Sequence, residues 1–248
     1  MMIEVKNLSY SYPDGTPALD GVTFSVRSGE SVAVVGENGA GKSTLLLHLN
    51  GTLAVESGEV VVNGARVDRS TLKNVRKMVG VVFQDPDDQL FMPVVADDVA
   101  FGPVNLGLSP EEVEKRVVES LSRVGALGLR DRPPHRLSAG EKRSVAIASV
   151  LSMDPEILVM DEPTSSLDPR GRRALIGLLK TLTQTKIVAT HDLDFVLDLC
   201  ERTIVIHRGR ILAEGRTEEI FQNEALLEES RLERPLRMQG CPLHGRPR

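Results

Sequence analysis

Eight consecutive residues constrain the fold of this chain more than any other feature. The run Gly36–Ser43 reads G-E-N-G-A-G-K-S and fits the pattern G-x-x-x-x-G-K-[ST] without a gap. The apolar run Ser31–Val35, expected to form a buried strand, comes before it, and a predicted helix over Ser43–Leu49 comes after it. Glycines permit the tight turn that points backbone N–H groups at phosphates, and the start of the helix adds a dipole that favours anions. The sequence therefore predicts a phosphate-binding loop inside an α/β domain.

Two side chains of this loop have distinct expected roles. Lys42 is expected to reach the β- and γ-phosphates of a nucleotide, and the Ser43 hydroxyl is expected to bind Mg²⁺. A purely structural glycine-rich loop is the alternative, which the flanking strand and helix disfavour. The residues expected to surround the nucleotide in this part of the chain are Gly36, Glu37, Asn38, Gly39, Ala40, Gly41, Lys42, Ser43 and Thr44.

A second acidic element follows the apolar run Ile157–Met160. Asp161 and Glu162 come directly after this predicted strand. Ligands of open α/β sheets bind at the carboxyl ends of the strands, so both carboxylates are expected near the phosphates. Asp161 is suited to hold Mg²⁺, and Glu162 is suited to act as a general base on the attacking water. An apolar run before Asp-Glu is a weak signal alone, and the phosphate-binding loop makes it a strong one.

Two further polar residues follow predicted strands at the same sheet edge. Gln84 follows the strand Val79–Phe83, where it is expected to sense Mg²⁺ or the attacking water. His191 follows the strand Lys186–Thr190 and is expected to contact the γ-phosphate. Both residues are singled out by position alone.

A second candidate anion site lies far from the loop in sequence. In Leu137–Glu141, Ser138 is a natural helix N-cap, and the small residues Ala139 and Gly140 would let a phosphate approach the helix N-terminus. A plain capped helix is the alternative. If both segments bind one nucleotide, two chains must face each other head to tail.

The remaining pattern predicts three regions. Short alternating runs before about residue 62 indicate strands, and Asn63-Gly64 is typical of a hairpin turn. Ser109-Pro110-Glu111-Glu112 reads as a capping box before an apolar stripe at helical spacing, so the middle of the chain is a helical insertion. The alternation of strands and helices that follows predicts a parallel sheet.

Composition excludes several classes of protein. The net charge of −5 argues against a general nucleic-acid binder, and an aromatic content of 3% without tryptophan leaves few surfaces for base stacking. No apolar run approaches the length of about 18 residues that a membrane-spanning helix needs. The N-terminus lacks the features of a signal peptide, and two cysteines are too few for a disulfide scaffold. We expect a soluble α/β protein whose membrane role depends on a partner.

These motifs, in this order over about residues 3–220, make the chain similar to the nucleotide-binding subunits of ABC transporters. The resemblance implies the following assignments along the chain: Tyr12 as the aromatic that stacks on adenine, with Tyr10 a less suitable substitute; Gly36–Ser43 as the Walker A loop; Gln84 as the Q-loop glutamine; Ser138, Ala139, Gly140 and Glu141 as the signature motif; Asp161 as the Walker B aspartate; Glu162 as the catalytic glutamate; Ser165–Asp168 as the D-loop; and His191 as the switch histidine.

The resemblance also implies a fold and a division into regions. The fold is that of a P-loop NTPase, with a RecA-like parallel-sheet core, an N-terminal antiparallel β subdomain and a helical insertion. The expected ATPase domain covers residues 1–225, with its core at about 1–89 and 143–220 and its helical subdomain at about 90–142. Residues 226–248 change from acidic to basic and are expected to form a flexible tail.

One stretch of sequence indicates a particular group within this family. The run Val82–Phe91, followed by Asp97–Pro103, resembles the ATPases of energy-coupling-factor importers, within them the cobalt and nickel branch. The resemblance implies an ATP-hydrolysing subunit that binds ATP and Mg²⁺ and lies peripherally at the cytoplasmic face of the cell membrane. Its implied partners are a polytopic transmembrane subunit, a substrate-binding membrane component and a second ATPase subunit, either a copy or a paralogue.

Other functions stay open at this point. One alternative is a soluble ABC ATPase acting on DNA or ribosomes, although such proteins tend to carry two modules or a long coiled-coil insertion. Another is an importer ATPase for a vitamin such as biotin, because another subunit chooses the cargo. A plain kinase or GTPase leaves the Leu137–Glu141 segment unexplained.

The sequence departs from the family pattern at the signature motif. The family usually has Leu-Ser-Gly-Gly-Gln, and here Ala139 and Glu141 replace the first Gly and the Gln. Ala139 adds a methyl group where backbone approaches phosphate, and Glu141 adds a negative charge near an anionic ligand. Either change is expected to slow hydrolysis without abolishing it, because Glu162 is present.

Two further predictions concern an acidic segment after Gln84 and the C-terminal tail. Asp85, Asp87, Asp88, Asp97 and Asp98 are expected to form an acidic docking groove for basic residues of the transmembrane subunit. A solvated acidic loop is the alternative. In the tail, Cys241 and His244 are too few for a structural zinc site, and deletion of residues 231–248 is expected to leave ATPase activity intact.

Overall fold

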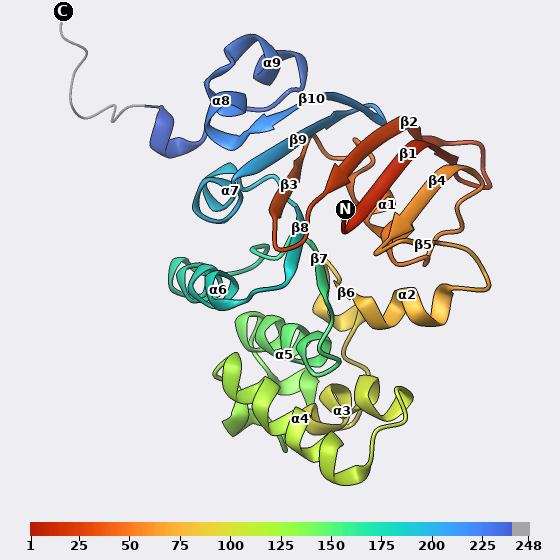
Figure 1. The fold of residues 1–248 in the computed structure, drawn as a ribbon. Helices are drawn as coiled ribbons and strands as arrows, with labels where there is room; N and C mark the ends of the chain where they lie inside the picture. Colours follow the sequence, from red (N-terminus) through yellow and green to blue (C-terminus); the bar gives the residue numbers. More distant parts are fainter. Residues whose placement is uncertain (240–248) are drawn as a thin grey trace, which may run out of the picture.

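The structure is a computed structural model that describes residues 1–239. It confirms the predicted α/β fold, with a parallel core, an N-terminal antiparallel sheet and a helical insertion (Figure 1). The strands are β1 (Ile3–Ser11), β2 (Pro17–Val26), β3 (Ser31–Val35), β4 (Ser57–Val62), β5 (Ala65–Arg66), β6 (Val79–Val82), β7 (Ile157–Asp161), β8 (Thr185–Ala189), β9 (Arg202–His207) and β10 (Arg210–Arg216). The α-helices are α1 (Lys42–Leu49), α2 (Leu72–Met78), α3 (Val95–Asn105), α4 (Pro110–Arg123), α5 (Ala139–Leu151), α6 (Pro169–Thr181), α7 (Leu193–Leu199), α8 (Thr217–Gln222) and α9 (Glu224–Glu229).

In the larger sheet, the carboxyl ends of the parallel strands lie along the same edge. Its strand order is β10-β9-β3-β8-β7-β6, and all neighbours pair in parallel except β10 and β9. The smaller sheet has the order β2-β1-β4-β5 and is antiparallel. Its β4–β5 hairpin turns at Asn63 and Gly64, whose φ angles of 46° and 78° are the positive values that such a two-residue turn requires.

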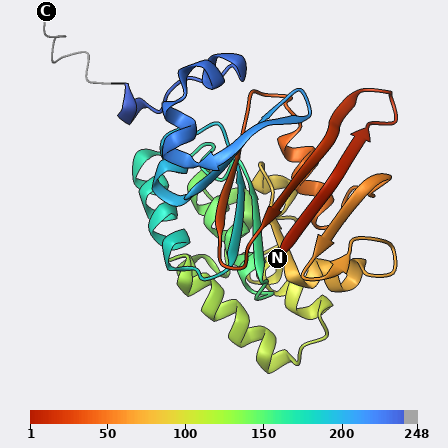
Figure 2. The same ribbon diagram turned by 45° about the horizontal axis from the view of Figure 1, so that its top comes forward.

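Helix α1 is buried between the two sheets. Its residues Leu45, Leu46 and Leu49 belong to one apolar cluster that joins the antiparallel sheet to one face of the parallel sheet. The opposite face is covered by α5, α6 and α7, whose apolar side chains form a second cluster. Figure 2 shows the teal and cyan helices α6 and α7 on the far side of the parallel sheet from the red and orange antiparallel strands. Because the parallel strands are buried on both faces, their sequences are continuous apolar runs.

The helical insertion has an apolar cluster of its own. It joins α3, α4 and the first half of α5, and extends from Leu90 to Ala148. Ile147, Val150 and Leu151 of α5 pack instead against the parallel sheet. The subdomain boundary expected at residue 142 therefore falls inside α5, which is shared by both parts. Among residues 1–239, no helix is long and apolar enough to cross a bilayer.

The C-terminal segment differs from the expected flexible tail over residues 226–239. Leu226 and Leu227 are buried in the second cluster, and a short 3-10 turn covers Leu236–Met238. The charges that suggested a solvated tail instead pair with the body of the protein, since Arg237 contacts two carboxylates of α7. Cys241 and His244 lie outside the described residues.

Candidate active site

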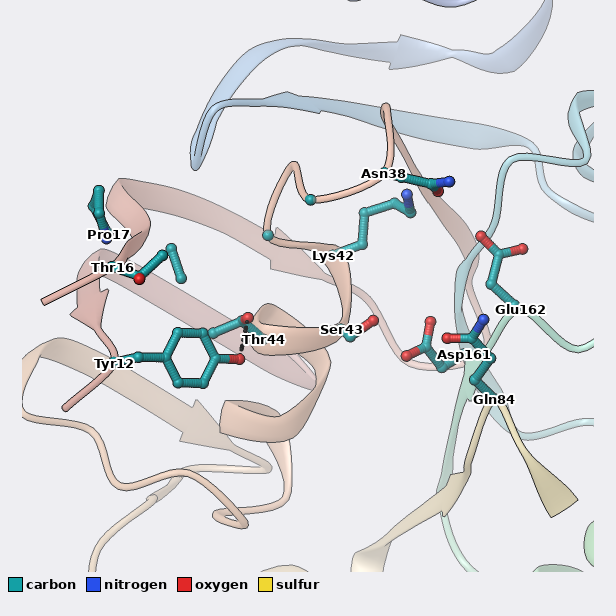
Figure 3. Close-up of a pocket in the computed structure, with 13 residues that line it drawn as sticks. Tyr12, Thr16, Pro17, Asn38, Lys42, Ser43, Thr44, Gln84, Asp161 and Glu162 are labelled. Carbon is teal, nitrogen blue, oxygen red and sulfur yellow. Dashed lines mark hydrogen bonds between the residues drawn. The ribbon is translucent and has the colours of Figure 1, made fainter. Parts of the chain in front are cut away.

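A cavity of about 460 Å³ lies at the carboxyl-end edge of the parallel sheet, beside the start of α1 (Figure 3). Four separate segments of the chain contribute to it. The cavity is lined by Tyr12 and Thr16–Ala18 from the β1–β2 connection and the start of β2, Asn38, Gly39 and Gly41–Thr44 from the phosphate-binding loop and the start of α1, Gln84 after β6, and Asp161 and Glu162 at the end of β7. The structure thus brings together most of the residues that the sequence singled out.

The shape of the phosphate-binding loop depends on its glycines and its neighbours. Gly39 and Gly41 have φ angles of 80° and 104°, in the left-handed region that favours glycine. A Cβ atom at Gly41 would collide with the carbonyl oxygen of Ala18. From the β9–β10 turn, the Gly209 N–H donates a hydrogen bond of 3.0 Å to the Ala40 carbonyl. The conformation of the loop is therefore supported by contacts with the start of β2 and with the β9–β10 turn.

The Lys42 side chain lies inside the loop. It is only 7% exposed, and its Nζ donates hydrogen bonds to the carbonyls of Gly36 at 2.8 Å and Glu37 at 3.1 Å. Burial lowers the pKa of Lys42, and the nearby carboxylates of Glu162 and Asp161 oppose this shift. An ammonium group in this position can exchange loop carbonyls for phosphate oxygens with little movement.

Three oxygen-bearing side chains converge at the end of β7. Figure 3 shows the Ser43 hydroxyl, the Asp161 carboxylate and the Gln84 amide pointing toward one another. Within residues 1–239, the buried Oδ1 of Asp161 has no hydrogen-bond partner. Burial raises the pKa of Asp161, and a hydrogen bond with Ser43 opposes this shift.

This donor set fits Mg²⁺, which prefers oxygen ligands and is often held by one or two protein groups together with substrate phosphates and water. Among the described residues there is no group of three or more His, Cys, Asp or Glu side chains that would hold a metal ion by themselves. A divalent ion here would therefore depend on oxygens supplied by a nucleotide and by water.

Glu162 is held by two residues that follow β8. Its Oε2 accepts hydrogen bonds from the Thr190 hydroxyl at 2.9 Å and from the His191 N–H at 3.3 Å. The His191 Nδ1 lies 2.9 Å from the same oxygen. Glu162 is buried and has a φ angle of 45°, which is uncommon for a residue with a side chain. His191 therefore contacts Glu162 and does not line the cavity, and Thr190 is a site residue that the sequence did not reveal.

The aromatic residue at the mouth of the cavity is Tyr12. Its hydroxyl lies 2.9 Å from the Thr44 hydroxyl on α1 (Figure 3). Tyr10 does not line the cavity and instead packs edge-on against Tyr12 and His48, at ring distances of 5.2 and 4.8 Å. The structure thus separates the two candidates and favours Tyr12.

The segment that begins at Ser138 does not line this cavity. Ser138 caps α5, and the Oε2 of Glu141 accepts hydrogen bonds from the Ser138 N–H at 2.8 Å and hydroxyl at 2.9 Å. These bonds lower the pKa of Glu141. Gly140 and Glu141 line a separate hollow between α4, α5 and α6, while Ala139 lines another. Asp168 caps α6 by accepting a hydrogen bond from the Gly171 N–H at 2.6 Å.

A buried arginine links three of the predicted site segments. Arg143, on α5, is 3% exposed and donates hydrogen bonds to the carbonyls of Phe83 at 2.7 Å and Gln84 at 2.6 Å. It also donates to the Ser165 hydroxyl at 2.9 Å. Sequence reasoning missed Arg143, although a signal existed, because it stands at helical spacing from the buried Ile147.

The five aspartates of the expected acidic docking groove do not share one groove: Asp85, Asp87 and Asp88 line one hollow together with Lys142 and Arg143, whereas Asp97 and Asp98 do not line it. Asp98 is buried and accepts hydrogen bonds from the N–H groups of Phe91 and Met92, at 2.9 and 3.0 Å. Burial raises the pKa of Asp98. Asp87 pairs with Lys142, and Asp85 accepts a hydrogen bond from the Asp87 N–H at 2.9 Å. Asp85, Asp87 and Asp98 thus each make a separate local contact.

A groove of about 760 Å³ lies next to this segment, between α2, α3 and β6. Phe91 and Phe101 stand at its rim, 62% and 44% exposed, with their rings 5.0 Å apart. Its lining carries four cationic side chains, against the carboxylates of Asp88 and Asp98. The cationic residues are Arg69, Lys73, Arg76 and Lys77. The groove is thus apolar and basic.

Comparison with known proteins gives a consistent result. The family described as ABC transporter matches residues 19–165. A putative ABC transporter ATP-binding protein of Geobacter sulfurreducens is 62% identical over 245 residues, which cover 99% of this chain and 98% of that protein. The energy-coupling factor transporter ATP-binding protein EcfA of Methanothermobacter thermautotrophicus is 52% identical over 239 residues, covering 94% and 77%. The solved structure of CbiO1 from Clostridium perfringens, described as part of the ABC transporter complex CbiONQ, has a TM-score of 0.81 and 42% identity, covering 92% and 93%.

Proposed function

This chain belongs to the ABC transporter family as an ATP-binding and ATP-hydrolysing subunit, and we propose that it energises an importer of the energy-coupling-factor type. The cavity carries this proposal, because it gathers Lys42, Ser43, Gln84, Asp161 and Glu162 from separate segments at one sheet edge. The 52% identity to EcfA supports the importer type.

The phosphate-binding loop holds the triphosphate in this proposal. Its N–H groups and the N-terminus of α1 attract the phosphates, and the Nζ of Lys42 moves from the loop carbonyls onto the β- and γ-phosphates. Tyr12 packs against the adenine at the mouth of the cavity. Ser43, Asp161 and Gln84 would hold Mg²⁺, which when bound would neutralise developing charge on the phosphates.

Glu162 acts as the general base. Thr190 and His191 fix its carboxylate by the hydrogen bonds described above, so that it can accept a proton from the attacking water. The His191 side chain is 67% exposed and free to turn from Glu162 toward the γ-phosphate. The chemistry therefore depends on a base that is already oriented before the nucleotide enters.

Two ATPase subunits work together in this proposal. Ser138–Glu141 lies outside the nucleotide cavity, and head-to-tail pairing would place it against the nucleotide of the other subunit. The second subunit is a copy of this chain or a paralogue. The Glu141 carboxylate occupies the Ser138 hydroxyl and N–H, so a phosphate must compete with it for these donors.

The membrane partners are a polytopic transmembrane subunit and a substrate-binding membrane component, which place the chain peripherally at the cytoplasmic face of the cell membrane. The basic and apolar groove at Phe91 and Phe101 is the proposed docking surface for the transmembrane subunit. Its charge fits a partner segment with apolar and acidic side chains. Cobalt or nickel ions are the proposed cargo, on the resemblance of the Val82–Phe91 segment; a vitamin such as biotin is the second candidate.

Reconstitution tests this function. The chain is co-expressed with the membrane proteins encoded beside it, and the purified complex is placed in vesicles with labelled Co²⁺, Ni²⁺ or biotin. ATP-driven uptake that is lost in Lys42→Ala supports the proposal and identifies the cargo. Purification with ribosomes or DNA, and without any membrane protein, would favour the alternative of an ABC ATPase that acts outside the membrane.

A further inference from the structure

The segment that follows α9 connects two parts of the active site. We call residues 231–239 the C-terminal strap. At one end, the Arg231 guanidinium lies 3.2 Å from the Glu37 carboxylate of the phosphate-binding loop. At the other end, Arg237 contacts Asp194 and Asp198 on α7, the helix that follows His191. The composition of the strap had suggested that it could be deleted without consequence.

At the Glu37 end, the strap pairs with an acidic side chain of the phosphate-binding loop. Glu37 is an acidic residue inside a loop that binds a polyanion, and its free carboxylate would repel the ligand. In the structure the carboxylate is turned onto Arg231 and onto the Nδ1 of His207, which lies 3.1 Å away. The Glu37 main-chain carbonyl, meanwhile, accepts a hydrogen bond from Lys42. Arg231 thus neutralises Glu37 and fixes its orientation.

The α7 end of the strap resolves a repulsion between like charges. Asp194 and Asp198 are four residues apart on one face of α7. Arg237 donates a hydrogen bond of 2.5 Å to Asp198, while the N–H groups of Leu236 and Arg237 donate to Asp194 at 2.9 and 3.2 Å. The Arg237 guanidinium lowers the pKa of Asp198.

The position of α7 affects the catalytic base. Asp192 caps α7 and makes a bidentate pair with Arg172 of α6, at 2.7 and 3.0 Å. His191, the residue before this cap, contacts Glu162 at 2.9 Å. A shift of α7 therefore moves the His191 main chain, which donates one of the hydrogen bonds that orient Glu162.

We infer that the C-terminal strap is a clamp that positions the phosphate-binding loop through Arg231 and the His191–Glu162 pair through Arg237. This inference rests on the proposed ATPase function of the same site. Both arginines are positioning residues, because neither lines the nucleotide cavity. The two ends of the strap affect different steps. Arg231 supports the affinity for the nucleotide, and Arg237 supports the rate of turnover.

Steady-state kinetics of the full chain in its transporter complex test this division. In Arg231→Ala, the KM for ATP is expected to rise about two- to fivefold with kcat nearly unchanged, as the loss of one partly exposed ion pair implies. In Arg237→Ala, kcat is expected to fall about two- to fivefold with KM nearly unchanged, and Arg237→Lys should restore part of it. Arg234→Ala is the matched control, since Arg234 pairs with Glu224 of α9, outside the site.

Two additional variants make the test specific. In Glu37→Gln, the Arg231→Ala change should lose its effect on KM, because no carboxylate remains to be neutralised. Removal of residues 240–248 alone should leave both kinetic constants unchanged, whereas removal of residues 231–248 should alter both. Equal kinetics in Arg231→Ala, Arg237→Ala and the unaltered chain would overturn the clamp, as would the same losses in Arg234→Ala.

Hydrogen exchange of the nucleotide-free chain separates this inference from the proposed function. Arg231→Ala should speed amide exchange in residues 36–42, and Arg237→Ala should speed it in residues 191–199, while Arg234→Ala changes neither segment. Absence of ATP turnover in the unaltered complex would contradict the proposed function, whereas unchanged exchange in both segments would contradict the clamp alone.

Discussion

The guanidinium of Arg143 donates a hydrogen bond of 2.6 Å to the main-chain carbonyl of Gln84. The same group reaches Ser165, so α5, the segment after β6 and the segment after β7 share one buried cation. Helix α5 begins at Ser138, which we expect to face the nucleotide of a second subunit. We therefore expect a displacement of α5 by that contact to move the Gln84 main chain.

Replacing Arg143 with Met should uncouple these segments. The change removes hydrogen bonds to Phe83, Gln84 and Ser165, and leaves buried carbonyls without partners. We expect the free energy of unfolding to fall by about 3 kcal/mol, from the usual value of bonds to a charged group. ATPase activity measured below the unfolding temperature should fall at least about tenfold. The control is Lys142→Ala, which breaks only the pair with Asp87. Activity in Arg143→Met equal to this control would contradict the coupling.

Replacing Lys42 with Ala should remove most of the affinity for ATP. The variant loses a buried cation that no other side chain in the loop replaces. Loss of one partner of such a charge pair costs about 2–5 kcal/mol, so the Kd for ATP should rise at least about thirtyfold. Titration calorimetry measures this, with Lys77→Ala in the groove as a control. An unchanged Kd in Lys42→Ala would rule out the loop as the phosphate site.

Asp161→Asn should stabilise the nucleotide-free chain at neutral pH. Burial raises the pKa of Asp161, so between the unfolded-state and folded-state pKa values the folded chain binds more protons. The free energy of unfolding therefore falls as pH rises through that window, and above it the full cost of the buried charge is present. The uncharged amide avoids this cost, and we expect Tm at pH 7.5 to rise by about 2–4 °C.

In Asp161→Asn, the rise in Tm that Mg²⁺-ATP causes in the unaltered chain should be lost, because the proposed metal ligand is gone. Thermal unfolding with and without Mg²⁺-ATP measures both effects, and Asp131→Asn on the surface serves as the control. A lower Tm for nucleotide-free Asp161→Asn, or an unchanged gain from Mg²⁺-ATP, would contradict the assignment of Asp161.

Replacing Phe91 and Phe101 with Ser should weaken assembly with the transmembrane subunit. The two rings present exposed apolar area at the groove rim, and loss of such anchors typically costs about 1–2 kcal/mol or more each. The yield of complex after affinity purification should drop, while the isolated chain keeps its ATP affinity. Leu127→Ser, a partly exposed apolar residue outside the groove, is the control. Normal assembly of the double variant would place the docking surface elsewhere.

Local patterns made much of the site predictable. The glycines and Lys42 of the loop lie in one short motif, and the two carboxylates at the end of β7 are consecutive, so their chemistry follows from spacing and from the known ligand-binding edge of a parallel sheet. The strands of the core were equally clear, because burial on both faces gives continuous apolar runs.

The missed contacts are long-range ones. Thr190 reaches Glu162 across 28 residues, and Arg143 reaches Gln84 across 59, so no spacing rule connects them. The contacts of the strap are long-range as well, since the partners of Arg231 and Arg237 stand far back in the chain. The aspartates after Gln84 were predicted to act together, although Asp85, Asp87 and Asp98 each make a separate local contact.

The most direct test of the account replaces Glu162 with Gln. The amide keeps the size of the side chain but cannot accept a proton, so ATP hydrolysis should fall by about a hundredfold or more while ATP still binds. The variant should accumulate as an ATP-loaded dimer on size-exclusion chromatography, with Glu219→Gln on the surface behaving like the unaltered chain. Turnover by Glu162→Gln at the unaltered rate would contradict the central claim that this cavity hydrolyses ATP through Glu162.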